Sequence, residues 1–254
     1  MSIRDAVIIG FVQGITEFLP ISSSGHLVIF QKILNINSPG NLIEVSAHLG
    51  TLLSILFIYK SDIWSLAATA KTQKSKYYIF LIILATIPSV VFVFLGKSFL
   101  LSLFDSIGSV SIALIFTGII LFISGFRKNA DKKLNISKGL IIGMSQALAI
   151  IPGISRSGMT ISLALLLGIS AKEAAKFSFM LAIPAIFGAT ILTLLDAQFN
   201  QYQQMIYPLL ITALVSFISG YIALNSLIKI LNTGKFFYFS FYCIFVGLIS
   251  LLYF

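Results

Sequence analysis

Long apolar runs separated by short polar segments make up most of the chain. A helix needs roughly 20 apolar residues to cross the hydrocarbon core of a bilayer. The runs here are continuous rather than alternating, which favours helices over barrel strands. The pattern therefore predicts an all-α polytopic membrane protein. Its six predicted transmembrane helices lie at 43–59, 77–96, 108–126, 176–195, 207–228 and 236–254.

Two further apolar stretches are broken near their middle. In the stretch 6–34 the break falls at Pro20 and a following run of serines, and in the stretch 139–168 it falls at Pro152 and Gly153. The pieces on either side of each break are too short to cross a bilayer. Broken helices at membrane depth are tolerated where they line a protected or water-filled cavity. We therefore predict two re-entrant helix–loop–helix pairs, each of which dips into the membrane and returns on the same side.

The two broken stretches resemble each other in sequence. At an offset of 133 residues, eight of the eighteen positions 8–25 carry the same residue in 141–158. We predict a single membrane domain, 1–254, built from repeat one (1–126) and repeat two (127–254), each with one re-entrant pair and three spans. Because three is odd, the second repeat starts on the opposite side of the membrane. The halves are then inverted repeats, and their two loops meet near the midplane.

Basic residues predict the orientation of these spans. Only 10% of the residues are charged, the mean hydropathy is +1.03 and the formal net charge is +9. In a soluble protein such a charge would suggest nucleic acid, but here the lysines and arginines lie in short loops, so no nucleic-acid partner is expected. The predicted topology places thirteen of the seventeen on one side, three on the other, and Arg156 in the second loop. The basic side is cytoplasmic, so both termini are predicted to face outside.

The two loops carry polar residues that packing inside a membrane does not require. Such groups are costly in hydrocarbon, so a cluster of them indicates a functional site. One loop supplies Glu17, Ser23 and His26, and the other supplies Arg156. A planar guanidinium suits phosphate, and the helix after each Ser-Gly pair would direct its positive end to the same place. Because neither loop holds all these groups, we predict that they meet and form one phosphate-binding site.

Each of these residues also has a structural alternative. Arg156 and Glu17 could be no more than a buried ion pair. His26 could donate to a backbone carbonyl, or it could act as a proton donor or base that activates Ser23 as a nucleophile. Gln13 precedes Glu17 by four residues, so the two share a helix face. Their oxygens suit Mg²⁺ or Ca²⁺, although Gln13 could also only hydrogen-bond within its loop.

Other polar residues near the loops receive smaller roles. Glu44 and His48 are also four residues apart, but they lie near the predicted membrane interface, so a structural role is favoured. The glycines and hydroxyl residues of the loops could shape the backbone or contact phosphate. The candidate substrate-binding residues are Ser22, Ser24, Gly25, Gly153, Ser155, Ser157, Gly158 and Thr160.

The two loops resemble the paired signatures of bacterial undecaprenyl-diphosphate phosphatases of the bacitracin-resistance type. The matching segments are Q-G-I-T-E-F-L-P-I-S-S-S-G-H at 13–26 and P-G-I-S-R-S-G-M-T at 152–160. The resemblance covers the whole chain, including H-L-G-T at 48–51 and K-F-S-F at 176–179. It implies a hydrolase of the bacterial plasma membrane that removes the terminal phosphate of undecaprenyl diphosphate, recycles the cell-wall lipid carrier and gives bacitracin resistance. It also implies six spanning helices and two re-entrant pairs in inverted repeats.

The resemblance further implies roles for particular residues. By motif position, the catalytic residues are Glu17, Ser23, His26 and Arg156, and a divalent cation, Mg²⁺ or Ca²⁺, is required. Gln13 stands where some members of the family carry a second glutamate. The expected metal ligands are therefore Glu17 and Gln13.

Two rival functions fit part of the pattern. The segment S-S-G-H at 23–26 resembles the P-S-G-H motif of type-2 phosphatidic-acid phosphatases, but their second motif fails, since Ser162 and Leu166 stand where it needs histidine and aspartate. Inverted repeats with broken helices are also a transporter design, so a transporter or flippase of a prenyl-phosphate lipid is the alternative. The expected partners are a prenyl diphosphate substrate and membrane lipid, and a homodimer remains open.

Overall fold

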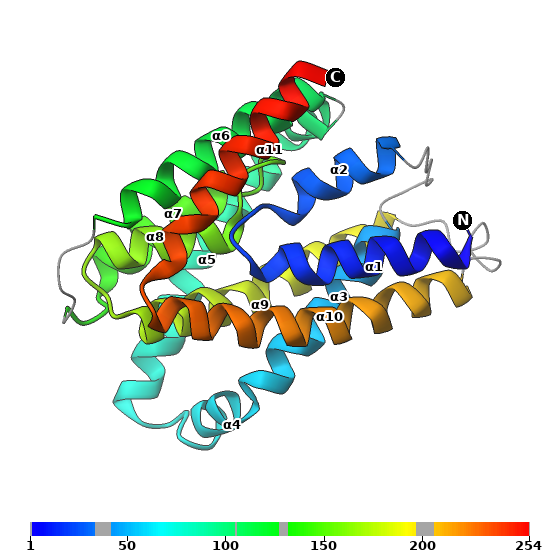
Figure 1. Ribbon diagram of the computed structural model, residues 1–254. Helices are drawn as coiled ribbons and strands as arrows, with labels where there is room; N and C mark the ends of the chain where they lie inside the picture. Colours follow the sequence, from blue (N-terminus) through cyan, green and yellow to red (C-terminus); the bar gives the residue numbers. More distant parts are fainter. Residues whose placement is uncertain (1, 34–41, 105, 127–131, 197–205, 254) are drawn as a thin grey trace.

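The computed structural model describes residues 2–33, 42–104, 106–126, 132–196 and 206–253. Within these ranges the regular elements are helices and no strand occurs, which confirms the predicted all-α class (Figure 1). The elements are α1 (Ile3–Phe18), α2 (Ser23–Ile33), α3 (Leu42–Ile58), α4 (Lys60–Ala68), α5 (Gln73–Phe104), α6 (Ile107–Ser124), α7 (Ile136–Leu148), α8 (Arg156–Leu166), α9 (Ala171–Asp196), α10 (Ile206–Asn232), the 3₁₀ helix η3 (Lys235–Tyr238) and α11 (Phe239–Tyr253).

The long apolar helices agree with the predicted spans. In the part of the chain that the structure describes, five segments are long and apolar enough to cross a membrane, and they lie in α5, α6, α9, α10 and the η3–α11 segment. A sixth is obtained if α3 and α4, which meet at an angle of 69°, count as one broken span. The helices extend past the predicted limits, since α5 begins at Gln73 and ends at Phe104. This length and composition confirm a multi-pass membrane protein.

Helix α4 is an element that the hydrophobic pattern does not predict. None of its residues is buried, so it has no apolar stripe that would mark a packed helix. Trp64 is exposed on it, as expected for an aromatic side chain at a membrane interface. One ion pair ties it to α9, with Nζ of Lys176 2.5 Å from Oδ1 of Asp62. The helix therefore lies beside the bundle rather than inside it.

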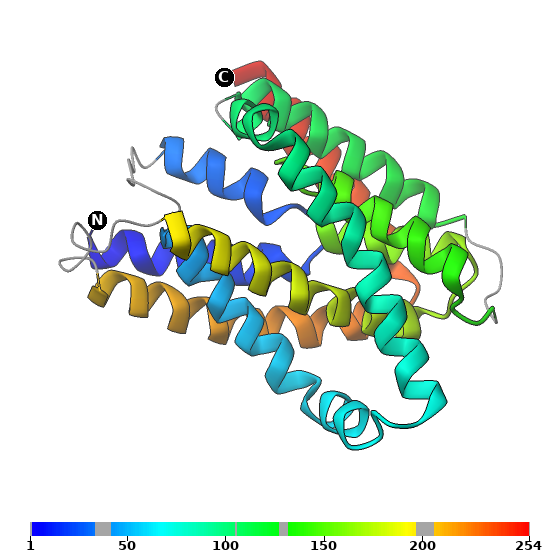
Figure 2. The same cartoon turned by 180° about the vertical axis from the view of Figure 1, so that it is seen from behind.

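Helices from the two predicted repeats pack against each other. Helix α1 packs along α10, and α7 packs along α5. The equivalent glycines Gly10 and Gly143 permit these close approaches, because a Cβ on the first would collide with the Thr212 carbonyl and on the second with the Ala85 carbonyl. The start of α1 and the end of α11 lie toward the same end of the molecule (Figures 1 and 2). This packing fits two repeats, while the inverted topology, the re-entrant path and the repeat limits stay predictions.

The predicted boundary between the repeats adjoins residues 127–131, which lie outside the described residues, as does the last residue of the predicted first pair, Leu34. Residues 127–131 include part of the basic linker, whose lysines and arginine contribute to the predicted membrane orientation.

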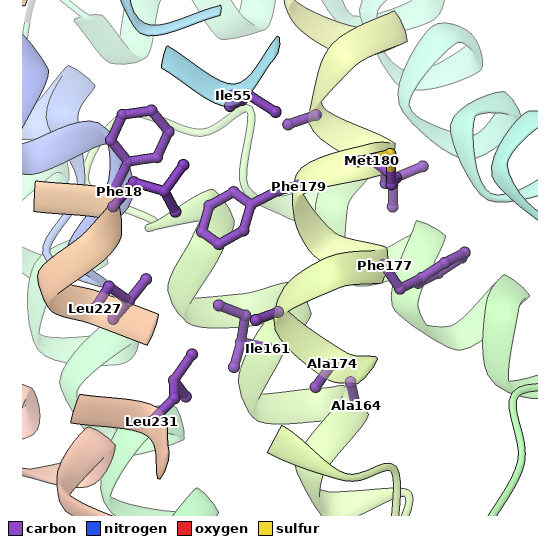
Figure 3. Packing of buried hydrophobic residues seen from close by; sticks show 14 of the residues in the cluster. Phe18, Ile55, Ile161, Ala164, Ala174, Phe177, Phe179, Met180, Leu227 and Leu231 are labelled. Carbon is purple, nitrogen blue, oxygen red and sulfur yellow. The ribbon is translucent and has the colours of Figure 1, made fainter. Parts of the chain in front are cut away.

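The largest apolar cluster adjoins the two loops and includes residues from the helices that flank them. Phe179 of α9 points toward Phe18 at the end of α1, and the cluster continues below this pair with Leu227 and Leu231 of α10 and Ile161 of α8 (Figure 3). The two phenylalanine rings meet edge to face, with centroids 5.7 Å apart. Side chains from both halves thus share one core, which holds the ends of α1 and α8 at fixed positions.

Candidate active site

The first loop is shaped by a proline and by a serine in an unusual conformation. Pro20 cannot continue α1, so Leu19 is extended (φ −62°, ψ 142°) and the helix ends at Phe18. Ser22 then adopts the left-handed region with φ 67°, which residues other than glycine rarely do. Its hydroxyl accepts a hydrogen bond from the Gly25 N–H at 3.3 Å, so it closes the first turn of α2. The chain reverses here, and the last turn of α1 faces the first turn of α2.

The second loop is held by a hydroxyl from a different helix. Oγ1 of Thr117 in α6 donates to the Gly153 carbonyl at 3.0 Å and accepts from the Ser155 N–H at 3.1 Å. Gly153 has φ +96°, and a Cβ there would collide with the Val110 carbonyl, so only glycine fits. Ser155 caps α8 by accepting from the Gly158 N–H at 3.1 Å. These contacts place Arg156 at the N-terminus of α8.

The two loops are in direct contact, as the sequence predicts. Nη2 of Arg156 donates to Oε1 of Glu17 at 2.5 Å. Oγ of Ser157 donates to the Leu19 carbonyl at 3.4 Å. A Cβ on Gly25 would lie 3.1 Å from Cα of Gly153, so the backbones themselves touch. An acid from one loop and a guanidinium from the other therefore form a single cluster.

The Glu17 carboxylate is the centre of this cluster. Its side chain is 6% exposed and that of Arg156 is 14% exposed. Oε2 of Glu17 accepts from Oγ of Ser23 at 2.6 Å and from Nε2 of Gln13 at 3.0 Å. Nδ1 of His48 lies 3.7 Å away. A buried carboxylate needs such donors and a balancing cation, and Arg156 supplies the positive charge.

Two polar atoms beside the carboxylate lack partners. Oε1 of Gln13 and Nη1 of Arg156 are buried, and neither has a hydrogen-bond partner among the residues that the structure describes. Buried polar atoms are nearly always paired, so unpaired ones indicate a place for a ligand or an ion. The guanidinium nitrogen is a donor suited to a phosphate oxygen, and the amide oxygen is an acceptor suited to a hard cation. The ion pair with Glu17 therefore uses Nη2 of Arg156 and leaves the Nη1 group for an anion.

His26 makes one of the two contacts that the sequence suggests, together with one that it does not. Its Nδ1 lies 2.8 Å from the Ser22 carbonyl oxygen, and its Nε2 lies 2.8 Å from the hydroxyl of Tyr242. Within the described residues, Ser23 bonds to Glu17 and not to His26. The carbonyl contact that was one alternative for His26 is present. Glu17 is thus the base nearest to Ser23.

Two residues that contact the site have no catalytic or binding role in the sequence prediction. His48, for which a structural role is favoured, places Nδ1 2.9 Å from Nε2 of Gln13, whereas Glu44 accepts from Nε2 of Gln31 at 3.3 Å. Tyr242 comes from α11, far along the chain from either loop. The position of His48 in the H-L-G-T segment is a signal that could have identified it. A tyrosine in an apolar run gives no such signal, because tyrosines also occur there as interfacial anchors.

Most of the candidate substrate-binding residues shape the loops. Ser22 and Ser155 cap helices, and Thr160 donates or accepts at 2.6 Å with Ser178 of α9. Ser23 and Ser24 are only half-buried. Oγ of Ser24 lies 3.3 Å from Oγ of Ser22, so this hydroxyl is weakly held. The accessible hydroxyls of the first loop are therefore those of Ser23 and Ser24.

The expected cation has a partial set of ligands. Among the described residues no group of three or more histidine, cysteine or acidic side chains is placed to hold a metal ion. Glu17 and the unpaired amide oxygen of Gln13 are two oxygen donors. Mg²⁺ commonly takes one or two protein oxygens and completes its shell with phosphate oxygens and water. The residues present fit a cation that binds together with a diphosphate.

Comparison with known proteins points to a single family. A family model described as bacitracin resistance protein BacA matches residues 6–249. The chain is 38% identical to an undecaprenyl-diphosphatase of Halothermothrix orenii, over 99% of this chain and 98% of the relative. It is 38% identical to one of Carboxydothermus hydrogenoformans, over 97% and 95%. For one of Thermosipho africanus the identity is 39%, over 96% and 97%. The similarity extends over nearly the full length of each chain.

Proposed function

The chain belongs to the bacitracin resistance protein BacA family and is an undecaprenyl-diphosphate phosphatase, and we propose that its two loops perform the reaction together. The reaction releases inorganic phosphate and leaves undecaprenyl phosphate, which recycles the lipid carrier of cell-wall synthesis and gives bacitracin resistance. One observation carries the proposal. Glu17 of the first loop contacts both Arg156 of the second loop and Ser23, at 2.5 and 2.6 Å.

Arg156 and the start of α8 bind the diphosphate in this proposal. The unpaired Nη1 of Arg156 donates to a phosphate oxygen, while Nη2 stays on Glu17. The positive ends of the α8 and α2 dipoles add to the attraction for the anion. Phosphoryl transfer depends mainly on positioning and on neutralising charge, and these groups supply both.

Ser23 is the nucleophile and Glu17 is its base. As Oγ of Ser23 forms a bond to the terminal phosphorus, Glu17 takes the hydroxyl proton, and the bond from that phosphorus to the bridging oxygen breaks, so undecaprenyl phosphate leaves. Glu17 gives this proton to the departing undecaprenyl phosphate and is again a carboxylate. Water then attacks the phosphorus of the phosphoserine while Glu17 takes a proton from the water. As the bond from phosphorus to Oγ of Ser23 breaks, Glu17 returns the proton to that oxygen, and inorganic phosphate is released. A carboxylate paired with arginine is a weak base. When the bound phosphate shares the Arg156 guanidinium through Nη1, the positive charge stabilises the Glu17 carboxylate less, so Glu17 becomes a stronger base. Water activated by His26 is the alternative nucleophile, and the contact between Ser23 and Glu17 favours the serine.

A divalent cation, Mg²⁺ or Ca²⁺, would be held by Glu17 and by Oε1 of Gln13, with diphosphate oxygens and water as further ligands. When bound it would neutralise phosphate charge. The side chains of Gln13 and Glu17 are already oriented by their mutual hydrogen bond at 3.0 Å. The cation would therefore join a preformed pair rather than assemble it.

The setting of the enzyme follows from the same resemblance. We infer a location in the bacterial plasma membrane with both termini outside, and a site that takes a prenyl diphosphate from the lipid phase. The relatives carry the name of a phosphatase, so a transporter or flippase is not favoured.

The experiment measures phosphate release by the purified protein from undecaprenyl diphosphate, with Mg²⁺ or Ca²⁺ present. The wild type should release phosphate, and Ser23→Ala should lose this activity while remaining folded. Ser226→Ala, which alters an exposed serine of α10, is the matched control and should keep it. If the wild type moves the lipid between leaflets without hydrolysing it, the protein is a transporter or flippase and not a phosphatase. Full activity in Ser23→Ala would instead favour water activated by His26.

A further inference from the structure

Helix α11 contacts the first loop through two consecutive residues. The hydroxyl of Tyr242 lies 2.8 Å from Nε2 of His26, and the two rings are stacked, with centroids 5.7 Å apart and an interplanar angle of 10°. The thiol of the next residue, Cys243, donates to the Pro20 carbonyl at 3.4 Å. The position of Tyr242 against His26 is therefore set by two neighbouring contacts.

The partners of His26 determine which ring nitrogen carries the hydrogen. The Ser22 carbonyl, 2.8 Å from Nδ1, can only accept a hydrogen bond, so Nδ1 must donate. In the neutral imidazole Nε2 is then the bare nitrogen, and it accepts from the Tyr242 hydroxyl. The basic nitrogen of His26 is thus covered by a phenol.

Burial differs sharply between the two members of this pair. His26 is 4% exposed, whereas Tyr242 is 42% exposed. Both ring nitrogens of His26 are already bonded, to Ser22 and to Tyr242. A proton that enters or leaves the imidazole at Nε2 must therefore pass the tyrosine hydroxyl.

We propose that Tyr242 is a catalytic residue that fixes the tautomer of His26 and relays protons between Nε2 and the reacting phosphate or its water. This proposal rests on the phosphatase function above. In the relay, the phenol gives its proton to Nε2 while its oxygen accepts a proton from the water or from a phosphate oxygen. The phenol ends unchanged, the imidazole becomes a cation, and the reverse transfer restores both. His26 in this way stores a proton for the reaction without contacting the substrate.

The kinetic test removes only the hydroxyl. Tyr242→Phe keeps the stacked ring, so it should fold normally and should lower kcat roughly 10-fold while KM stays unchanged, as expected when one hydrogen bond is lost at a proton-transfer step. In a His26→Ala background the same substitution should have no further effect. Tyr238→Phe is the control, because Tyr238 is exposed one turn earlier and contacts Phe237 and Phe241. A wild-type kcat in Tyr242→Phe, or equal losses with and without His26, would overturn the relay.

A spectroscopic test reads the pair without the reaction. The chain has two histidines, so ¹⁵N-histidine labelling gives two imidazoles, and His48→Gln assigns them. His26 should show hydrogen on Nδ1 and a bare, hydrogen-bonded Nε2, and the Nε2 signal should shift in Tyr242→Phe. Hydrogen on Nε2, or a signal unaffected by the substitution, would overturn the assignment. Absence of phosphate release by the wild type would count against the proposed function, whereas the ¹⁵N result would still decide the pairing.

Discussion

The buried ion pair between Glu17 and Arg156 leads to a prediction that separates stability from catalysis. The two side chains are 6% and 14% exposed and meet at 2.5 Å. Removal of one partner leaves the other as an unpaired buried charge, which lowers the stability of the fold by about 3–5 kcal/mol. Arg156→Ala should therefore lower the free energy of unfolding by about this amount. Adding Glu17→Gln removes the stranded charge, so the double variant should regain most of the lost stability while phosphate release stays absent.

The assay is unfolding in detergent by heat or denaturant, followed by circular dichroism, with phosphate release measured on the same samples. A second ion pair serves as the control. Lys176 and Asp62 also meet at 2.5 Å, but each side chain is about one third exposed. Water and salt screen such a pair, so Lys176→Ala should cost less than about 1 kcal/mol.

Two results would refute this reasoning. If the double variant is as unstable as Arg156→Ala alone, Glu17 does not carry a stranded buried charge, and the electrostatic account of the site fails. If Lys176→Ala is as costly as Arg156→Ala, burial is not what sets the energy of these pairs.

Two further predictions concern the second loop and the cation. Gly153→Ala should destabilise the protein by more than about 1 kcal/mol, since Gly153 has φ +96° and its Cβ would collide with the Val110 carbonyl, whereas Gly188→Ala, with nothing within 4 Å, should be tolerated; thermal unfolding compares the two, and equal melting temperatures would contradict the prediction. Gln13→Glu adds a carboxylate beside Glu17, so it should lower the cation concentration for half-maximal phosphate release by roughly 10-fold. An unchanged cation titration would remove Gln13 from the cation site.

The spans and the contact between the loops could be predicted from the sequence for physical reasons. Apolar runs of about 20 residues have few alternatives to a transmembrane helix. The loops were predictable because Pro20 and Pro152 break such runs, and polar groups are costly in hydrocarbon. The repeat then predicted that Glu17 and Arg156 meet, and the structure places them in contact.

What the sequence could not predict depends on side-chain direction and tertiary contact. The left-handed backbone of Ser22 turns His26 toward Tyr242 and leaves Ser23 facing Glu17, and no spacing rule reveals this orientation. Helix α4 lacks the apolar stripe that would have marked it. Tyr242 joins the site from a helix that resembles any apolar span. These features arise from packing between distant segments rather than from local pattern.

The most direct test of the account compares phosphate release from undecaprenyl diphosphate by the wild type, Glu17→Ala and Arg156→Ala, each verified as folded. Glu173→Ala and Arg4→Ala, which alter exposed residues of the same types, are the controls. If the two loops form one site, both site variants should lose at least about 100-fold in kcat, and the controls should match the wild type. Phosphate release that survives Arg156→Ala would contradict the composite site, because the second loop would then have no part in the chemistry.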